Sequence, residues 1–335
     1  MKRLILASAI AMSIGVTAAN ATSVVNIDPD GIVVGDPSLA VGALGWGNGN
    51  AISVPRTNTL DDTFQTYAHV GLDAFIDPNG TPIGGLNLNN AGGYEWTMVT
   101  GFQEVVSSHS GTIPNDTATF KVIPGGNNFF KIYYDVLRNA DNLTGKGFNN
   151  GTLILSGTVL PFDITTGYGA SSFNTTGGCT IDPITGAIVS CGKLDSFLTN
   201  NYPNIQSVSG NGSSQLQIDV GFAHPDFFKA GLSLLSVNFD TFQNLPYSQQ
   251  NPSSNFFDGT SYFCGAGPIT SGTAAQTAEQ CAANTLGSIN GINGENIAFQ
   301  VRGTSSFNVP EPASLALLGI GLSCLGFARR RKSRS

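Results

Sequence analysis

Hydrophobic and polar positions alternate along most of the chain between residues 22 and 308. An apolar residue at every second position places the apolar side chains on one face of an extended chain, so this pattern predicts half-buried β-strands. β-Branched and aromatic residues dominate the same segments, which is typical of strands. The nine predicted strands are Thr63–Val70, Tyr94–Val99, Gly101–Ser108, Thr117–Ile123, Phe129–Val136, Gly151–Leu160, Gln215–Val220, Ser236–Phe242 and Asn296–Arg302.

Clusters of glycine and asparagine separate these segments, for example at 125–128 and 210–212. Such residues accept positive φ angles and mark tight turns. Many short strands joined by tight turns predict a mostly-β domain, an antiparallel β-sandwich or jelly roll, with few short helices. The clearest helix is predicted from Thr273 through Cys281 towards Asn284, because a capping-box pattern begins at Thr273.

The N-terminus has the composition of a secretory signal peptide. Lys2 and Arg3 precede the apolar stretch Leu4–Val16, and small residues then lead to Ala19 and Ala21. This order predicts cleavage after Ala21 and export through the Sec machinery.

The C-terminus has three parts in a fixed order. Pro310, Glu311 and Pro312 precede an uncharged apolar run at 313–328, and a basic tail follows. A helix of that run is roughly 24 Å long, shorter than the ~30 Å hydrocarbon layer, so we expect a transmembrane helix that inserts only transiently. The basic tail favours the cytoplasmic side. Its charged residues are Arg329, Arg330, Arg331, Lys332 and Arg334.

This order of motif, apolar segment and basic tail resembles the PEP-CTERM sorting signal of Gram-negative bacteria. The resemblance implies that an integral-membrane cysteine transpeptidase, an exosortase, recognises Pro310, Glu311 and Pro312 and cleaves nearby. The chain then divides into a signal peptide (1–21), a secreted β-rich domain (22–308) and a sorting signal (309–335). An ordinary C-terminal tail anchor is the alternative.

Charged residues make up only 11% of the chain. Without the two terminal basic clusters, 8 basic residues remain against 22 acidic ones, a formal charge of −14. Nucleic acids and anionic lipids are bound by clustered Lys and Arg, so this composition argues against both as partners. A neutral-polar, acidic surface is suited to solubility outside the cell or to contact with polysaccharide.

Of the five cysteines, Cys324 lies in the apolar C-terminal run, and the other four fall into two pairs of near neighbours, Cys179 with Cys191 and Cys264 with Cys281. Four cysteines allow three pairings, but short separations in an oxidising compartment favour two local disulfides. The segment 180–189 carries an Asp-Pro-x-x-Gly turn between β-branched arms, so the first disulfide is predicted to close a hairpin. Metal binding is the alternative, although neither pair has CxxC spacing.

Catalytic motifs are absent from the sequence, which has no HExxH, nucleophile-elbow, Walker or dinucleotide-binding pattern. We therefore expect a protein without enzymatic activity or cofactor, and we expect His109, between two serines, in a polar loop. Asn26, Asp28 and Asp30 match the first ligands of an EF-hand loop, but Pro37 stands where the bidentate Glu belongs. Weak calcium binding and a plain Asx-Pro turn are the two interpretations.

Trp46 is the best candidate for a sugar-stacking residue because Gly45, Gly47 and Gly49 surround it. The alternative is a tryptophan in the core.

Several stretches also resemble the flocculation-associated PEP-CTERM proteins. This resemblance implies a non-enzymatic protein of the cell surface or extracellular matrix, which passes the inner membrane and helps cells to aggregate within exopolysaccharide. A secreted carbohydrate-binding β-sandwich module and a secreted hydrolase are the alternatives. The stretches are Asn26–Gly31, Gly45–Ala51, Phe64–Tyr67, Asn142–Leu155 and Asn201–Pro203.

Overall fold

The computed structural model describes residues 24–31, 38–55, 57, 59–112, 115–175, 179–198, 201–202, 205–229, 231–241, 247–265 and 296–308. Within these ranges the chain forms strands and no helix, which confirms the predicted mostly-β, antiparallel domain. The predicted helix at 273–284 and the predicted membrane helix lie outside the described residues.

Seventeen strands are described. They are β1 (Val25–Ile27), β2 (Leu39–Val41), β3 (Ala43–Val54), β4 (Thr63–Ile76), β5 (Glu95–Thr112), β6 (Asn115–Val122), β7 (Phe129–Asp135), β8 (Thr152–Val159), β9 (Ala170–Thr175), β10 (Cys179–Ile181), β11 (Ile188–Lys193), β12 (Gln206–Ser207), β13 (Gly210–Ala223), β14 (Leu234–Thr241), β15 (Asn255–Phe257), β16 (Tyr262–Cys264) and β17 (Ile297–Asn308).

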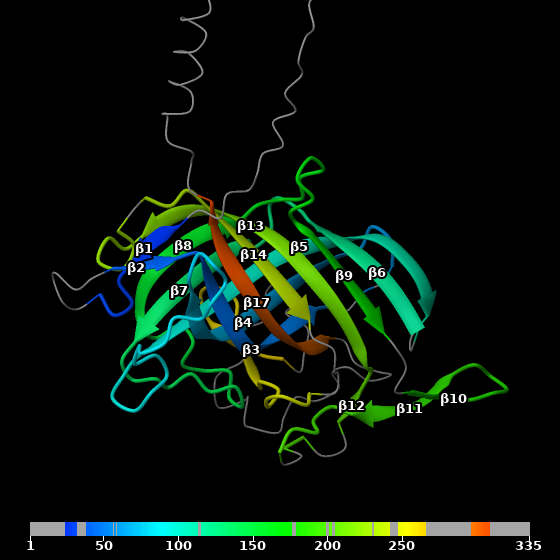
Figure 1. Cartoon of the computed structure of the whole chain (residues 1–335). Coiled ribbons are helices and arrows are strands. Elements are labelled where there is room, and N and C mark those ends of the chain that lie inside the picture. Colours follow the sequence, from blue (N-terminus) through cyan, green and yellow to red (C-terminus); the bar gives the residue numbers. More distant parts are fainter. Residues whose placement is uncertain are drawn as a thin grey trace, which may run out of the picture.

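The large sheet closes on itself into a barrel (Figure 1). Strands β6 and β7 lie end to end, and each pairs with one half of β5. In the same way β8 and β9 pair with the two halves of β13, so each couple fills one strand position that a loop interrupts. Strand β14 pairs with both β13 and β17, and β17 pairs with β3, which completes the ring. Each strand position in the ring follows the previous one along the chain, and β17 then pairs with β3 to close the ring. The connectivity is therefore an antiparallel meander and not the crossed order of a jelly roll.

All nine predicted strands fall on observed strands. Two of them, 94–99 and 101–108, form the single long strand β5, which passes through Gly101 without a break. Glycine is needed there for space, because a Cβ would lie 2.5 Å from the Phe129 ring and 2.8 Å from the Tyr67 ring. The sequence missed β3, whose glycines interrupt the alternation. A Cβ at Gly49 would lie 2.2 Å from the carbonyl oxygen of His69 on β4.

A second layer covers part of the outer face of β4 and β5. Strands β15 and β16 and the segment before β8 place aromatic rings there, and His69 lies between Phe148 and Phe256 at centroid distances of 4.3 and 5.2 Å. Tyr67 packs edge-on against Phe263 at 5.1 Å. The outward side chains of these strands are therefore buried as well, which explains why Tyr67 and His69 are both at most 5% exposed.

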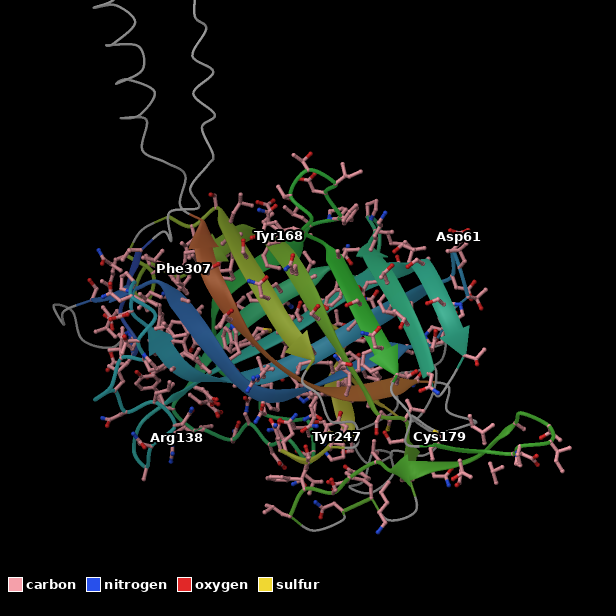
Figure 2. The ribbon with its side chains drawn as sticks, turned by 45° about the vertical axis from the view of Figure 1, so that its right-hand side comes forward. Asp61, Arg138, Tyr168, Cys179, Tyr247 and Phe307 are labelled. Atoms are coloured by element: carbon pink, nitrogen blue, oxygen red, sulfur yellow. A yellow bond between two sulfur atoms is a disulfide. The ribbon has the colours of Figure 1, made fainter. Side chains whose placement is uncertain are left out.

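Strands β10, β11 and β12 form a small separate sheet on an arm that stands away from the barrel (Figure 1). Cys179 and Cys191 face each other across β10 and β11 and form the predicted disulfide. Figure 2 shows Cys179 where the arm meets the body of the domain. The predicted turn is also present, because Asp182 Oδ1 accepts hydrogen bonds from the backbone N–H groups of Ile184 and Thr185, and Gly186 has φ of +68°.

Cys264 is also disulfide-bonded. Its predicted partner, Cys281, lies outside the described residues.

Candidate functional site

The predicted sorting and export residues lie outside the described part of the chain. These are Ala19 and Ala21, the motif Pro310, Glu311 and Pro312, and the basic residues of the tail. Among the described residues, no helix has both the length and the apolar character needed to cross a membrane.

Trp46 points into the barrel and does not form a sugar-stacking surface. Its side chain is only 3% exposed, and its Nε1 donates a hydrogen bond of 2.6 Å to Ser305 Oγ on β17. A ring that stacks on a sugar needs an open face, so the predicted glycan contact at Trp46 is wrong. Strand alternation explains the position, because Trp46 shares the inward face of β3 with the buried Leu44.

The candidate calcium residues form a turn closed by a cation. Asp28 is 3% exposed, its Oδ1 accepts a hydrogen bond from the Gly31 N–H, and its Oδ2 lies 3.3 Å from Lys229 Nζ. Asn26 is exposed on β1. The described part of the chain brings together no group of three or more His, Cys, Asp or Glu side chains able to hold a metal ion. Calcium binding by Asn26, Asp28 and Asp30 stays a prediction.

The three histidines lie in different surroundings. His109 is in strand β5 and not in the loop that the sequence predicted, and its Nε2 lies 2.8 Å from Asp116 Oδ1 on β6. His69 is buried in the outer layer, with its Nε2 2.8 Å from Ser253 Oγ. Burial lowers the pKa of His69 to about 3. His224 is partly exposed, and its Nδ1 lies 3.8 Å from Oδ2 of the exposed Asp226.

The interior of the barrel is packed with large side chains towards the end where Phe307 lies (Figure 2). Because the sheet is closed, every second residue of each strand points inward, and at this end those residues are bulky and nearly inaccessible to solvent. They are Leu44, Leu72, Phe75, Trp96, Met98, Phe130, Ile132, Leu216, Ile218, Leu235, Val237 and Phe307.

Inward positions towards the other end carry small side chains and leave a cavity of about 280 Å³. Strands β3, β4, β5, β6, β9, β13, β14 and β17 contribute to its wall, and the segment just before β4 adds Thr57 and Thr59. The small inward residues are Ala51, Ser53, Thr66, Ala68, Ala118, Ser171 and Ser214. Six phenylalanines supply most of the aromatic and apolar surface of the wall, namely Phe64, Phe102, Phe120, Phe173, Phe239 and Phe299.

Glu104 is the polar centre of this cavity. Its side chain is 3% exposed on the inward face of β5, where Thr66 Oγ1 donates to its Oε2 at 3.0 Å and Ser171 Oγ donates to its Oε1. Ser53 Oγ lies 3.0 Å from Thr66 Oγ1 and extends the chain of hydroxyls. Burial raises the pKa of Glu104 to about 7, and the hydrogen bonds from Ser171 and Thr66 oppose the shift.

The direction of these hydrogen bonds decides what the polar wall offers. Because the single hydroxyl proton of Thr66 is donated to Glu104, the Ser53 hydroxyl must be the donor to Thr66. The hydroxyl protons of Ser53, Thr66 and Ser171 are then all used. With Glu104 ionised, this wall offers hydrogen-bond acceptors to a ligand and no hydroxyl donor from these residues.

Sequence reasoning missed this cavity, although one signal was present. In the predicted strand Gly101–Ser108, Glu104 shares its alternation phase with Phe102 and Val106. A carboxyl on the apolar phase of a strand marks a buried charge. The small inward residues carried no such signal, because the closure that brings them together depends on pairings between strands far apart in sequence.

Comparison with known families identifies a motif in the C-terminal segment. Residues 308–332 match the model of the PEP-CTERM protein-sorting motif. The chain therefore carries a PEP-CTERM sorting motif at its C-terminus. The match confirms the PEP-CTERM sorting signal that the sequence predicted. This motif implies Sec-dependent export, processing by an exosortase, and a location at the cell surface or outside the cell. No curated protein and no solved structure matches the chain.

Proposed function

We propose that this PEP-CTERM protein is a non-enzymatic component of the cell surface or extracellular matrix that helps cells to aggregate within secreted polysaccharide. The observation that carries the proposal is the sorting motif at 308–332, which implies an exported, exosortase-processed protein. The acidic, lysine- and arginine-poor β domain supports it, because such a surface suits a hydrated polymer better than nucleic acid or anionic lipid. The proposal includes no cofactor.

The protruding arm also supports a role in contacts outside the cell. Ile184 at its turn is 93% exposed, and Ile181 and Val189 on its strands are 42% and 59% exposed. Exposed apolar side chains gathered on one projecting element are typical of a contact surface. The disulfide between Cys179 and Cys191 holds the two strands of the arm together.

Cells that lack the protein and are complemented with variants test this function. The intact chain should restore sedimentation of aggregated cells, whereas the triple variant Pro310→Ala, Glu311→Ala, Pro312→Ala should remain unprocessed and leave the cells dispersed. Full aggregation with the triple variant, or no effect of deleting the protein, would reject the proposal. A double variant Ile181→Asp, Ile184→Asp serves as the matched test of the arm: it should be exported and processed normally but aggregate cells less.

The carbohydrate-binding module remains the second candidate, but with Trp46 buried it needs a different contact surface. Saturable binding of the purified protein to one defined glycan, unaffected by the change of Ile181 and Ile184, would favour that candidate over a role in cell aggregation.

A further inference from the structure

The cavity inside the barrel has the size of a small-molecule site. Its volume of about 280 Å³ is roughly twice that of an apolar cavity that accommodates benzene, which takes ~150 Å³. The walls are formed by strands of one closed sheet, so the space is bounded by backbone that is hydrogen-bonded on both sides. Apolar walls with a few convergent polar groups are typical of ligand sites.

The charges on the wall have one sign. Of the described residues that line the cavity, the titratable ones are Glu104 on β5 and Asp116 on β6, both acidic; β3, β4, β9, β13, β14 and β17 contribute only uncharged side chains. Asp116 already has a partner in His109, 2.8 Å away. The partners of Glu104 are the neutral hydroxyls of Thr66 and Ser171. A buried carboxylate without a cation is costly, and none of the described residues that line the cavity supplies the positive charge that would stabilise it.

The phenylalanine rings also favour a positively charged ligand. Phe64 and Phe120 pack edge to face at a centroid distance of 5.0 Å, and Phe173 lies 5.8 Å from Phe299. The face of an aromatic ring attracts a cation through its quadrupole, and desolvation inside a cavity strengthens that attraction. An ammonium group beside Glu104 would meet both the carboxylate and aromatic walls, while an apolar tail would fill the remaining space.

We propose that the barrel interior binds a small organic cation, an ammonium head group held by Glu104 with an aromatic or short aliphatic tail among the phenylalanines. The orientation of the hydroxyls agrees, because an ammonium donates hydrogen bonds and this wall accepts them. The raised pKa of Glu104 implies that binding of a cation releases a proton near neutral pH. The site is independent of the proposed role in aggregation.

Calorimetry on the exported protein, purified from outside the cells, tests this with three probes of similar shape: 2-phenylethylammonium, 2-phenylethanol and 3-phenylpropionate. At about pH 8, where Glu104 is ionised, we expect the ammonium to bind at least about tenfold more tightly than the alcohol and the carboxylate to bind weakest. Equal or tighter binding of the alcohol or the carboxylate, or no heat with the ammonium at millimolar concentration, would overturn the proposal.

Two variants with one matched control locate the site. Glu104→Gln keeps the shape and removes the charge, so it should lower the affinity for the ammonium about tenfold and leave that for the alcohol nearly unchanged. Ala118→Leu fills the cavity and should abolish binding of both. Glu95→Gln is the control. Glu95 is a buried carboxyl on the same strand, but its side chain faces out of the barrel and accepts hydrogen bonds from the N–H groups of Asn139 and Ala140, so this variant should bind the probes like the native protein. Unchanged affinity for the ammonium in a folded Glu104→Gln protein would contradict the assignment.

Discussion

Thr66 on β4 donates a hydrogen bond of 3.0 Å to Glu104 on β5 inside the closed barrel. Thr66 pairs across the strands with Phe102, and Phe64 pairs with Glu104, so polar and aromatic side chains meet on one inward face. In a fully packed barrel these positions would hold bulky apolar residues, as they do near Phe307. The hydrogen bond between Thr66 and Glu104 therefore lies in the half of the interior that contains the cavity and is not filled by apolar side chains.

Replacing Glu104 by Gln should change how stability depends on pH. The pKa of Glu104 is raised from 4.5 to about 7 in the folded protein, so the folded state keeps a proton that the unfolded state loses. Its contribution to stability is fully present below about pH 4.5 and is lost as the pH rises through about 7, at most about 3 kcal/mol in all.

Urea unfolding at a series of pH values measures this loss. The Glu104→Gln variant should lack it and be the more stable protein at about pH 8. An identical slope of unfolding free energy against pH in the two proteins would show that Glu104 does not titrate in the folded state as described.

His69 should make stability depend on pH in the opposite direction from Glu104. Burial lowers its pKa from 6.5 to about 3, so the unfolded chain binds a proton that the folded one does not. Its contribution is present above about pH 6.5 and is lost as the pH falls towards 3, by up to about 5 kcal/mol. In acid unfolding, His69→Gln should lose less stability over that range than the native protein does. Equal acid sensitivity of the His69 variant and the native protein would refute this role.

Trp46→Ala should destabilise the domain by roughly 3–5 kcal/mol, because it removes a large side chain from the packed interior. Ser305→Ala leaves the ring in place and removes only its hydrogen-bond acceptor, so it should cost about 1–3 kcal/mol because the buried N–H of Trp46 loses its partner. Thermal or urea unfolding separates the two. If Trp46→Ala kept full stability but lost polysaccharide binding, the original interpretation of Trp46 as a sugar contact would return.

Reduction of the disulfide between Cys179 and Cys191 should loosen the arm and leave the barrel intact. The bridge spans a sequence separation of 12 residues, and closing a loop of this size contributes on the order of 3 kcal/mol locally. Limited proteolysis should therefore cut between β10 and β11 much faster in the variant Cys179→Ser, Cys191→Ser, while the main thermal transition stays in place. A large fall in that transition would mean that the arm supports the barrel.

The strand alternation predicted the fold class well, because period-two burial depends on residues close in sequence, as in Gln215–Val220. It did not predict β3, since Gly45, Gly47 and Gly49 read as breakers, whereas their missing side chains make room for β4. The same glycines suggested an exposed Trp46, and the closed sheet turns that residue inward. Closure depends on the pairing of β17 with β3, which come from opposite ends of the domain's sequence.

Local chemistry was predicted where it is set by short spacing. The hairpin between Cys179 and Cys191 and the turn at Asp182 follow from residues within one short segment, and both are present. The contact between Glu104 and Ser171 joins β5 to β9 across 67 positions. No local pattern encodes that separation, so the cavity emerges only from the folded chain.

Whether an exosortase processes this protein is decided by the mass of the C-terminal peptide of protein recovered outside the native cells. We expect a chain that ends near Pro310, Glu311 and Pro312, with or without an added group, and that has lost the basic tail. A peptide that continues intact to Ser335 would contradict this expectation and point to a plain membrane anchor.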